Sequence, residues 1–195
     1  MSVTVRPLTG AEIAAALDDL ARLRITVFAA WPYLYDGDAD YEADYLRAFA
    51  AAPDGVLVAA FDGARIVGAA TASPMSAQKA AFQAPFAARG LDVARLFYFG
   101  ESVLLPEYRG HGAGQAFFDH REGRARACNA NAACFVAVIR PTDHPARLAD
   151  YQPLDSFWRK RGYAPMPGLI TELAWKEHGE AEESPKPMQV WLSQW

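Results

Sequence analysis

The sequence predicts an α/β protein built on a mixed β-sheet with helices on both faces. Three observations predict this class: apolar residues recur at helical spacing in several segments, β-rich runs separate those segments, and an Asp-Gly pair joins two of the runs. The chain has 195 residues, of which 52% are apolar, so it can bury a core of its own. We therefore expect a single domain over residues 1–195.

The first half of the chain alternates β-rich runs with amphipathic segments. Thr9 and Glu12 form the Thr-x-x-Glu pattern of a capping box, which predicts a helix from here to about Phe28. Asp40 is placed to cap a second helix, which Pro53 ends. The strands expected in this half cover residues 3–8, 56–61 and 64–73, and the last two form a hairpin around Asp62-Gly63.

The second half continues the mixture. Residues 80–89 predict a helix that Pro85 interrupts and Gly90 ends. Residues 178–187 are acidic and contain proline, which favours a solvated loop. The other elements expected here are strands over 95–105, 135–139, 170–175 and 188–192, and helices over 115–127 and 154–161.

The composition excludes several classes of function. The net charge of −4 and the pI near 5.6 argue against binding to the phosphate backbone of nucleic acid. No apolar run approaches the roughly 20 residues of a membrane helix, and the first residues carry no apolar signal segment, so we expect a cytoplasmic protein without a membrane partner. Cys128 and Cys134 are too few and too badly spaced for a zinc site, so no metal is expected.

One segment carries chemistry. A β-rich run leads through Pro106-Glu-Tyr into Arg109 and a glycine-rich turn, Gly110-His-Gly-Ala-Gly114, which opens a helix. Glycine lets the backbone approach a ligand, and the first N–H groups of a helix have no partner within it, so we expect a phosphate or pyrophosphate site. The Gly-Lys-Ser/Thr end of a mononucleotide P-loop is missing, and so is the last glycine of a dinucleotide fingerprint.

The run from Arg109 to Gly114 matches the pattern Arg/Gln-x-x-Gly-x-Gly/Ala, and the chain resembles the GNAT superfamily of acyl-CoA-dependent N-acyltransferases. The hairpin, the strand over 135–139 and the run Phe157-Trp-Arg-Lys-Arg-Gly-Tyr163 fall in the family's order, so the resemblance covers most of residues 3–192. It implies a mostly antiparallel sheet of six or seven strands with a V-shaped slot after the fourth. It also implies acetyl transfer from acetyl-CoA to a primary amine of an unidentified small-molecule or peptide acceptor, as a monomer or a homodimer.

By the same resemblance, the coenzyme runs along the slot. The thioester lies near Ser102, where a free backbone N–H polarises its carbonyl, and Gly100 is the expected bulge residue that begins the divergence of the strands. Trp158 packs on the pantetheine and Lys160 approaches the adenine end. The pyrophosphate lies on a loop of six residues, Arg109, Gly110, His111, Gly112, Ala113 and Gly114, and the pantetheine bonds the backbone of Val103, Leu104 and Leu105.

The sequence offers one candidate base and two candidate replacements for the usual acid. Glu101 stands in an apolar run beside the expected thioester, as a general base or as a salt-bridged structural carboxylate. Many family members place a tyrosine acid where this chain has Trp158, and an indole cannot supply a proton. Tyr151 or Tyr98 could replace that acid, or solvent could protonate the departing thiolate.

The acceptor is expected at the loop between the first two helices, which forms one wall of the acceptor site in similar proteins. Tyr33, Tyr35 and Asp36, with Asp38, could hold a cationic amine, or they could cover the core and cap the second helix. The missing tyrosine acid leaves a second function open, a non-catalytic acyl-CoA-binding or sensing domain. Glu101 favours the enzyme.

Overall fold

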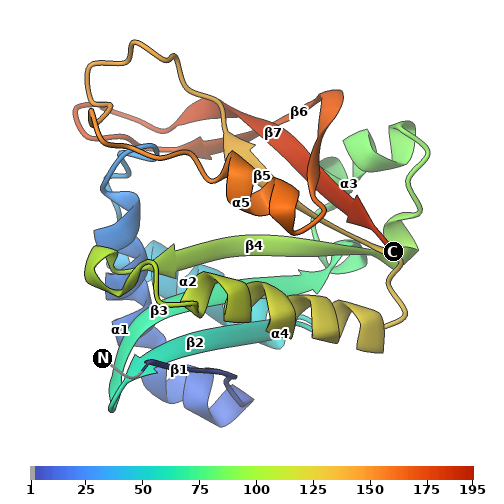
Figure 1. Cartoon of the computed structure of the whole chain (residues 1–195), viewed down its shortest axis with the longest axis horizontal. Helices are drawn as coiled ribbons and strands as arrows, with labels where there is room; N and C mark the ends of the chain where they lie inside the picture. Colours follow the sequence, from blue (N-terminus) through green and yellow to red (C-terminus); the bar gives the residue numbers. More distant parts are fainter. Residues whose placement is uncertain (1–2) are drawn as a thin grey trace.

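The computed structural model describes residues 3–195 as a seven-stranded sheet with helices on both faces (Figure 1). The strand order is β1-β2-β3-β4-β5-β7-β6, in which β4 and β5 are parallel and every other pair of neighbours is antiparallel. The expected mixed, mostly antiparallel sheet is confirmed. The strands are β1 (Val3–Pro7), β2 (Val56–Asp62), β3 (Arg65–Pro74), β4 (Leu96–Leu104), β5 (Ala132–Val138), β6 (Ala164–Trp175) and β7 (Ser184–Gln194).

The helices divide between the two faces of the sheet. In Figure 1, α4 and α5 lie in front of the sheet, and α1 and α2 lie behind it. No helix of residues 3–195 is both long and apolar enough to cross a membrane. The helices are α1 (Gly10–Phe28), α2 (Ala39–Ala51), α3 (Ala80–Ala88), α4 (Ala113–Ala127) and α5 (Asp155–Lys160), and the short 3-10 turns are η1 (Met75–Ala77), η2 (Val93–Arg95) and η3 (Pro106–Tyr108).

The start of α1 follows its sequence signal, and the start of α2 differs by two residues. The Thr9 hydroxyl accepts from the Glu12 N–H at 3.3 Å and Glu12 Oε2 accepts from the Thr9 N–H at 2.8 Å, which confirms the capping box. The prediction of Asp40 as the cap of α2 is wrong. Asp38 is the cap, since its extended backbone lets its carboxylate accept from the Tyr41 N–H at 2.8 Å.

Two further expectations need correction. Pro85 does not interrupt α3, which continues past it for three residues to Ala88. The segment expected to be a solvated loop contains the first residues of β7, and Lys186 within it is buried and bonds Glu180 at 3.0 Å. Proline and acidic residues concealed this strand, because they are poor strand signals on their own.

The two halves of the sheet separate along β4. β5 pairs with β4 only from Leu96 to Tyr98, although β4 continues to Leu104. Just after this point the β3–β4 register shifts between Ala70 and Ala72. The expected V-shaped slot therefore opens after Tyr98, and a β-bulge marks its start.

The bulge requires glycine at position 100. A Cβ at Gly100 would lie 2.4 Å from the Thr71 hydroxyl oxygen and 3.1 Å from the ring of Phe49. We expect Gly100→Ala to lower the free energy of unfolding by about 1–3 kcal/mol, measured by denaturant titration, because the bulge must shift to admit the methyl group. The matched control is Gly123→Ala in α4, where nothing lies within 4 Å; this change should stabilise by up to about 1 kcal/mol. Equal stabilities of the two variants would contradict the prediction.

Candidate active site

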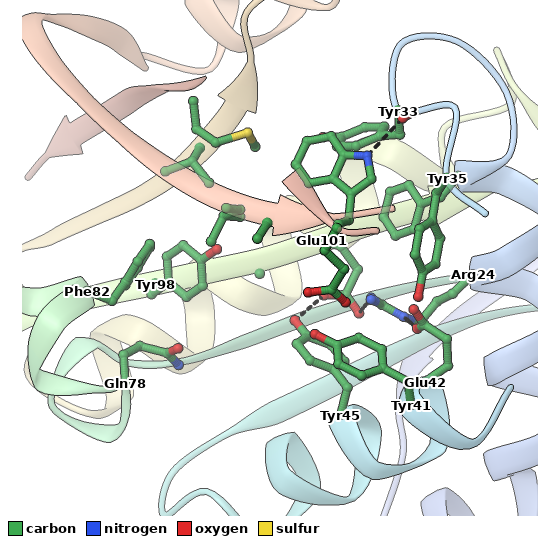
Figure 2. A pocket seen from close by; sticks show the side chains of 18 of the residues that line it. Arg24, Tyr33, Tyr35, Tyr41, Glu42, Tyr45, Gln78, Phe82, Tyr98 and Glu101 are labelled. Atoms are coloured by element: carbon green, nitrogen blue, oxygen red, sulfur yellow. Dashed lines mark hydrogen bonds and ion pairs between the residues drawn. The ribbon is translucent and has the colours of Figure 1, made fainter. Parts of the chain in front are cut away.

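A cavity of about 370 Å³ opens behind β4, at the point where β4 and β5 separate (Figure 2). Its walls come from α1, α2 and the loop between them, from β4, β5, β6 and β7, and from the segment that includes α3. Aromatic side chains make up much of the lining. Glu101 points into this cavity from β4, just past the bulge.

The Glu101 carboxylate is held by donors from three elements. Oε2 accepts from the Tyr45 hydroxyl on α2 and from the Thr71 hydroxyl on β3, both at 2.8 Å. Oε1 forms an ion pair with Nη1 of Arg24 on α1. The side chain is only 7% exposed, so Glu101 is a salt-bridged, buried carboxylate that also faces the cavity.

Arg24 is the residue that sequence reasoning missed most plainly. It lies buried on the face of α1 that packs on the sheet, and its Nε donates to Glu42, whose side chain is 1% exposed. Burial alone would lower the pKa of Arg24, but Glu101, Tyr45 and Glu42 raise it well above its usual value, so Arg24 stays charged. The only sign of it in the sequence is a charged residue at a position of the first helix where the repeat of buried residues predicts an apolar one.

The phenols of Tyr33, Tyr45 and Tyr98 around the cavity are neutral. Burial raises the pKa of Tyr33 to about 12, and it raises the pKa values of Tyr45 and Tyr98 further still. Tyr98, one of the two tyrosines considered as an alternative acid, lines the cavity with its ring 4.9 Å from that of Phe82. Tyr151 is absent from the cavity lining; it is half-buried, with its ring 6.1 Å from that of Trp31.

The predicted acceptor loop reaches the cavity with two of its three residues. Tyr33 and Tyr35 line the cavity, and burial raises the pKa of Tyr35. Asp36 does not line it, because its carboxylate pairs with Lys176 at 2.9 Å, which lowers the pKa of Asp36. The acidic residue that fills this part of the wall is Glu42 of α2, which the sequence did not single out.

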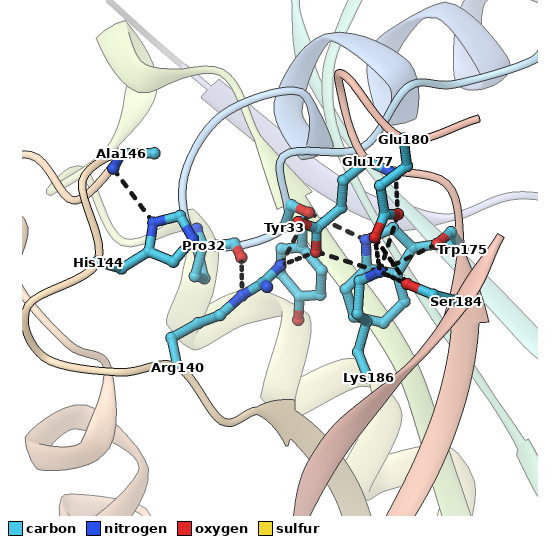
Figure 3. Close-up of polar contacts among 10 residues, drawn as sticks. All are labelled: Pro32, Tyr33, Arg140, His144, Ala146, Trp175, Glu177, Glu180, Ser184 and Lys186. Carbon is cyan, nitrogen blue, oxygen red and sulfur yellow. Dashed lines mark hydrogen bonds and ion pairs between the residues drawn. The ribbon is translucent and has the colours of Figure 1, made fainter. Parts of the chain in front are cut away.

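A second arginine fixes this loop in place (Figure 3). Arg140 follows β5 and donates to the carbonyls of Pro32 at 2.7 Å and Tyr33 at 3.1 Å. Its Nη2 also pairs with Glu177, which lies 3.6 Å from Lys186 Nζ. The α1–α2 loop and the β6–β7 connection are thus held together from the end of β5.

The glycine-rich turn has the geometry expected of an anion site. Gly110 and Gly112 have φ values of 80° and 87°, which only glycine adopts readily, and both are exposed. Within α4 the Ala116 N–H bonds the Gly112 carbonyl at 3.1 Å, so the N–H groups that precede it at the start of the helix have no acceptor in the helix. Arg109 and His111 are exposed at the same turn.

The backbone groups of β4 that point to the slot are not the ones that the sequence analysis expected. The Leu105 N–H donates to the Val67 carbonyl at 3.0 Å, on the β3 side. The N–H and C=O groups of successive residues point to alternate edges of an antiparallel strand. The groups of Val103 therefore point to β3, like those of Leu105, while the groups of Ser102 and Leu104 point to the slot. The expected backbone bonds from Val103 and Leu105 are therefore wrong, since the β3–β4 ladder uses these groups.

The helix α5 lies beside the slot and docks on α4. The ring of Trp158 packs 4.9 Å from Phe135 and 5.0 Å from Trp191. Lys160 is exposed, while its neighbour Arg161 bonds Asp119 and Glu122 of α4 at 2.8 and 3.0 Å. Trp158 is therefore partly buried and packs against the apolar cluster that contains Phe135 and Trp191.

The chain resembles known acetyltransferases in sequence pattern and in fold. The family model described as Acetyltransferase (GNAT) family matches residues 22–152. Aminoglycoside 6'-N-acetyltransferase complexed with coenzyme A has a TM-score of 0.62 and 16% identity, over 98% of this chain and 96% of that one. An acetyltransferase of the GNAT family from Streptococcus pneumoniae gives a TM-score of 0.60 and 13% identity, over 100% of both chains.

A structure of yncA from Salmonella typhimurium with its cofactor acetyl-CoA gives a TM-score of 0.58 and 12% identity, over 100% of this chain and 94% of that one. No curated protein matches the chain by sequence. The solved structures share the fold, and the family match extends over more than half of the 195 residues. The chain belongs to the GNAT acetyltransferase family.

Proposed function

We propose that this protein transfers an acetyl group from acetyl-CoA to the primary amine of an acceptor bound in the cavity. The observation that carries the proposal is the meeting of two sites at the bulge in β4. One side of the bulge leads to the free strand edge and the glycine turn, and the other leads to the cavity that holds Glu101. The two reactants would meet where β4 and β5 part.

The coenzyme fits the residues of the slot. The N–H groups from His111 to Gly114 would hold its pyrophosphate, with Arg109 and Gly110 beside them, because these N–H groups stand at the start of α4 and the turn from Arg109 to Gly112 is exposed. The edge groups of Ser102 and Leu104 would bond the pantetheine. Lys160 would lie near the adenine end of the coenzyme. Bound acetyl-CoA supplies an acetyl group activated as a thioester.

The chain's own residues would then manage two protons. The amine nitrogen attacks the carbonyl carbon, a C–N bond forms and the C–S bond breaks. Glu101 accepts the proton that the nitrogen loses, directly or through a water, and the N–H of Ser102 stabilises the carbonyl oxygen. A proton reaches the departing thiolate from Tyr98, from Tyr151 or from solvent.

One observation favours a second candidate, a non-catalytic acyl-CoA-binding or sensing domain. Trp158 replaces the tyrosine acid of many family members, and its ring packs on Phe135 and Trp191. Release of free thiol from acetyl-CoA in the presence of mixed primary amines separates the two functions. We expect thiol release, and binding of acetyl-CoA without it would favour the sensor.

The assignment of the coenzyme loop predicts the effect of Gly112→Val. Its φ of 87° disfavours any side chain, and the valine would also cover the N–H groups of the turn, so affinity for acetyl-CoA should fall at least about tenfold. Isothermal titration calorimetry measures this. The matched control is Gly90→Val, which has a similar φ of 76° outside the site and should leave affinity unchanged. Unchanged affinity in folded Gly112→Val would refute the assignment.

The assignment of Glu101 as the base predicts that Glu101→Gln lowers kcat by about 10²–10⁴-fold, since the amide accepts no proton. Affinity for acetyl-CoA should change little, because Glu101 faces the cavity. Thiol release with saturating acetyl-CoA measures kcat, and thermal unfolding checks that the variant is folded. Full activity would reduce Glu101 to a structural carboxylate.

A further inference from the structure

The cavity beside Glu101 has features that select among amines, and the inference drawn from them rests on the proposed function. Its volume of about 370 Å³ lies at the lower end of the roughly 300–1,000 Å³ of small-molecule sites. Tyr33, Phe82, Tyr98 and Trp175 present aromatic rings to it. A compact ligand with an apolar body fits such a lining better than a large polyhydroxylated one.

The charges of the cavity also restrict the acceptor. Glu42 and Glu101 share one guanidinium, that of Arg24, so the buried group carries one more negative than positive charge. Arg24 is the only arginine in the lining of the cavity that the structure describes, and both carboxylates already engage it. Arg121 of α4 lies on the opposite face of the sheet and bonds backbone carbonyls, while Lys79 and Glu183 are exposed residues of opposite charge in the lining.

We propose that the acceptor is a small primary amine on an aromatic or other apolar body that carries no carboxylate. Its ammonium would balance the excess charge of Glu42 and Glu101 on binding and would release one proton to solvent to become the nucleophilic amine, so that Glu101 accepts the second proton when the C–N bond forms. Its body would lie among the rings of Tyr33, Phe82 and Trp175. An amino acid would add a third carboxylate to Glu42 and Glu101, with no free arginine in the cavity lining to bind it. A polyamine would leave the aromatic wall unfilled.

The test compares three amines by thiol release from acetyl-CoA. 2-Phenylethylamine should exceed phenylalanine, which adds only a carboxylate, and spermidine, which has no ring, by at least about tenfold in kcat/KM. Phe82→Ala should raise the KM for 2-phenylethylamine about tenfold and leave the affinity for acetyl-CoA unchanged. The matched control is Ile170→Ala on β6, which removes an exposed apolar side chain absent from the cavity lining.

The experiment distinguishes failure of the proposed acceptor class from failure of the proposed function. Equal or better use of phenylalanine or spermidine would overturn the acceptor class and leave the proposed function intact. The proposed function itself would be overturned if the protein binds acetyl-CoA by calorimetry but releases no thiol with any of these amines, with a lysine peptide or with an aminoglycoside.

An independent observation concerns Arg121, an arginine of α4 that is only 2% exposed. Its donors reach backbone carbonyls: Nε lies 3.2 Å from the Phe117 oxygen, and Nη1 lies 3.2 Å from that of Glu101 and 3.5 Å from that of Thr71. Its guanidinium also lies 4.5 Å from the ring centroid of Phe99. Burying a charge is costly unless it is hydrogen-bonded, and these three carbonyls supply the hydrogen bonds.

The position of these carbonyls indicates the role of Arg121. Thr71 and Glu101 stand at the register shift, where the β3–β4 ladder is interrupted. Thr71 also holds the Glu101 carboxylate on the opposite side, through its hydroxyl. We propose that Arg121 is a positioning residue, which fixes the backbone of the bulge and thereby aims Glu101 into the cavity.

A double-mutant cycle tests this. Arg121→Met should lower kcat by about 10–100-fold, with affinity for acetyl-CoA within about twofold, and Arg121→Lys should recover part of the loss. In the Glu101→Gln background, Arg121→Met should lower kcat by less than about twofold, because Arg121 acts through Glu101. The control is Arg126→Met, which removes an exposed arginine of the same helix.

The results that would overturn the positioning role of Arg121 differ from those that would overturn Glu101 as the base. An unchanged kcat, an equal loss in the Glu101→Gln background, or a parallel loss of coenzyme affinity would overturn the positioning role. Full activity of Glu101→Gln alone would overturn the base assignment and this inference with it. If Arg121→Met does not fold, the cycle is run with Arg121→Lys and the same criteria apply.

Discussion

The convergence of Arg24, Tyr45 and Thr71 on the carboxylate of Glu101 is the interaction on which the rest of the site depends. The three donors come from α1, α2 and β3, so one side chain joins both helices behind the sheet to two strands within it. A buried ion pair is worth little as a source of stability, since desolvation opposes the attraction. Its value here lies in fixing where one carboxylate points.

The opening of the sheet follows from the same region. Gly100 admits the Thr71 hydroxyl against the backbone, and the register of β3 and β4 shifts beside it. Because β4 then leaves β5, one edge of β4 faces the slot, while its Glu101 side chain faces the cavity. A single local irregularity therefore creates both halves of the proposed site.

The sequence predicts the local features of this fold and misses the long-range ones. The capping box of Thr9, the hairpin at Gly63 and the turn at Gly112 are readable because each is decided by a few adjacent residues. The partners of Glu101 are not readable, since Tyr45 lies 56 residues away and Thr71 lies 30 away. Only the fold brings these side chains together.

Strand parity and buried charge explain the remaining differences. Which edge Leu105 presents depends on its pairing with β3, and a shift of one residue exchanges the two edges. Lys186 on its own suggests a solvated loop, but it is buried because the half-buried carboxylates of Glu177 and Glu180 pair with it. In both cases the deciding partner lies on another segment, so no pattern within the segment records it.

The unpaired edge of β4 has a consequence for the unliganded protein. An extended ligand that bonds Ser102 and Leu104 takes the place of a missing strand, which is β-augmentation by a small molecule in the middle of a sheet rather than at its border. The folded state alone offers this edge, so occupancy adds to stability by mass action, by about 2.7 kcal/mol at a hundred times Kd. If acetyl-CoA binds along this edge as proposed, the resistance of the protein to unfolding depends in part on the concentration of acetyl-CoA around it.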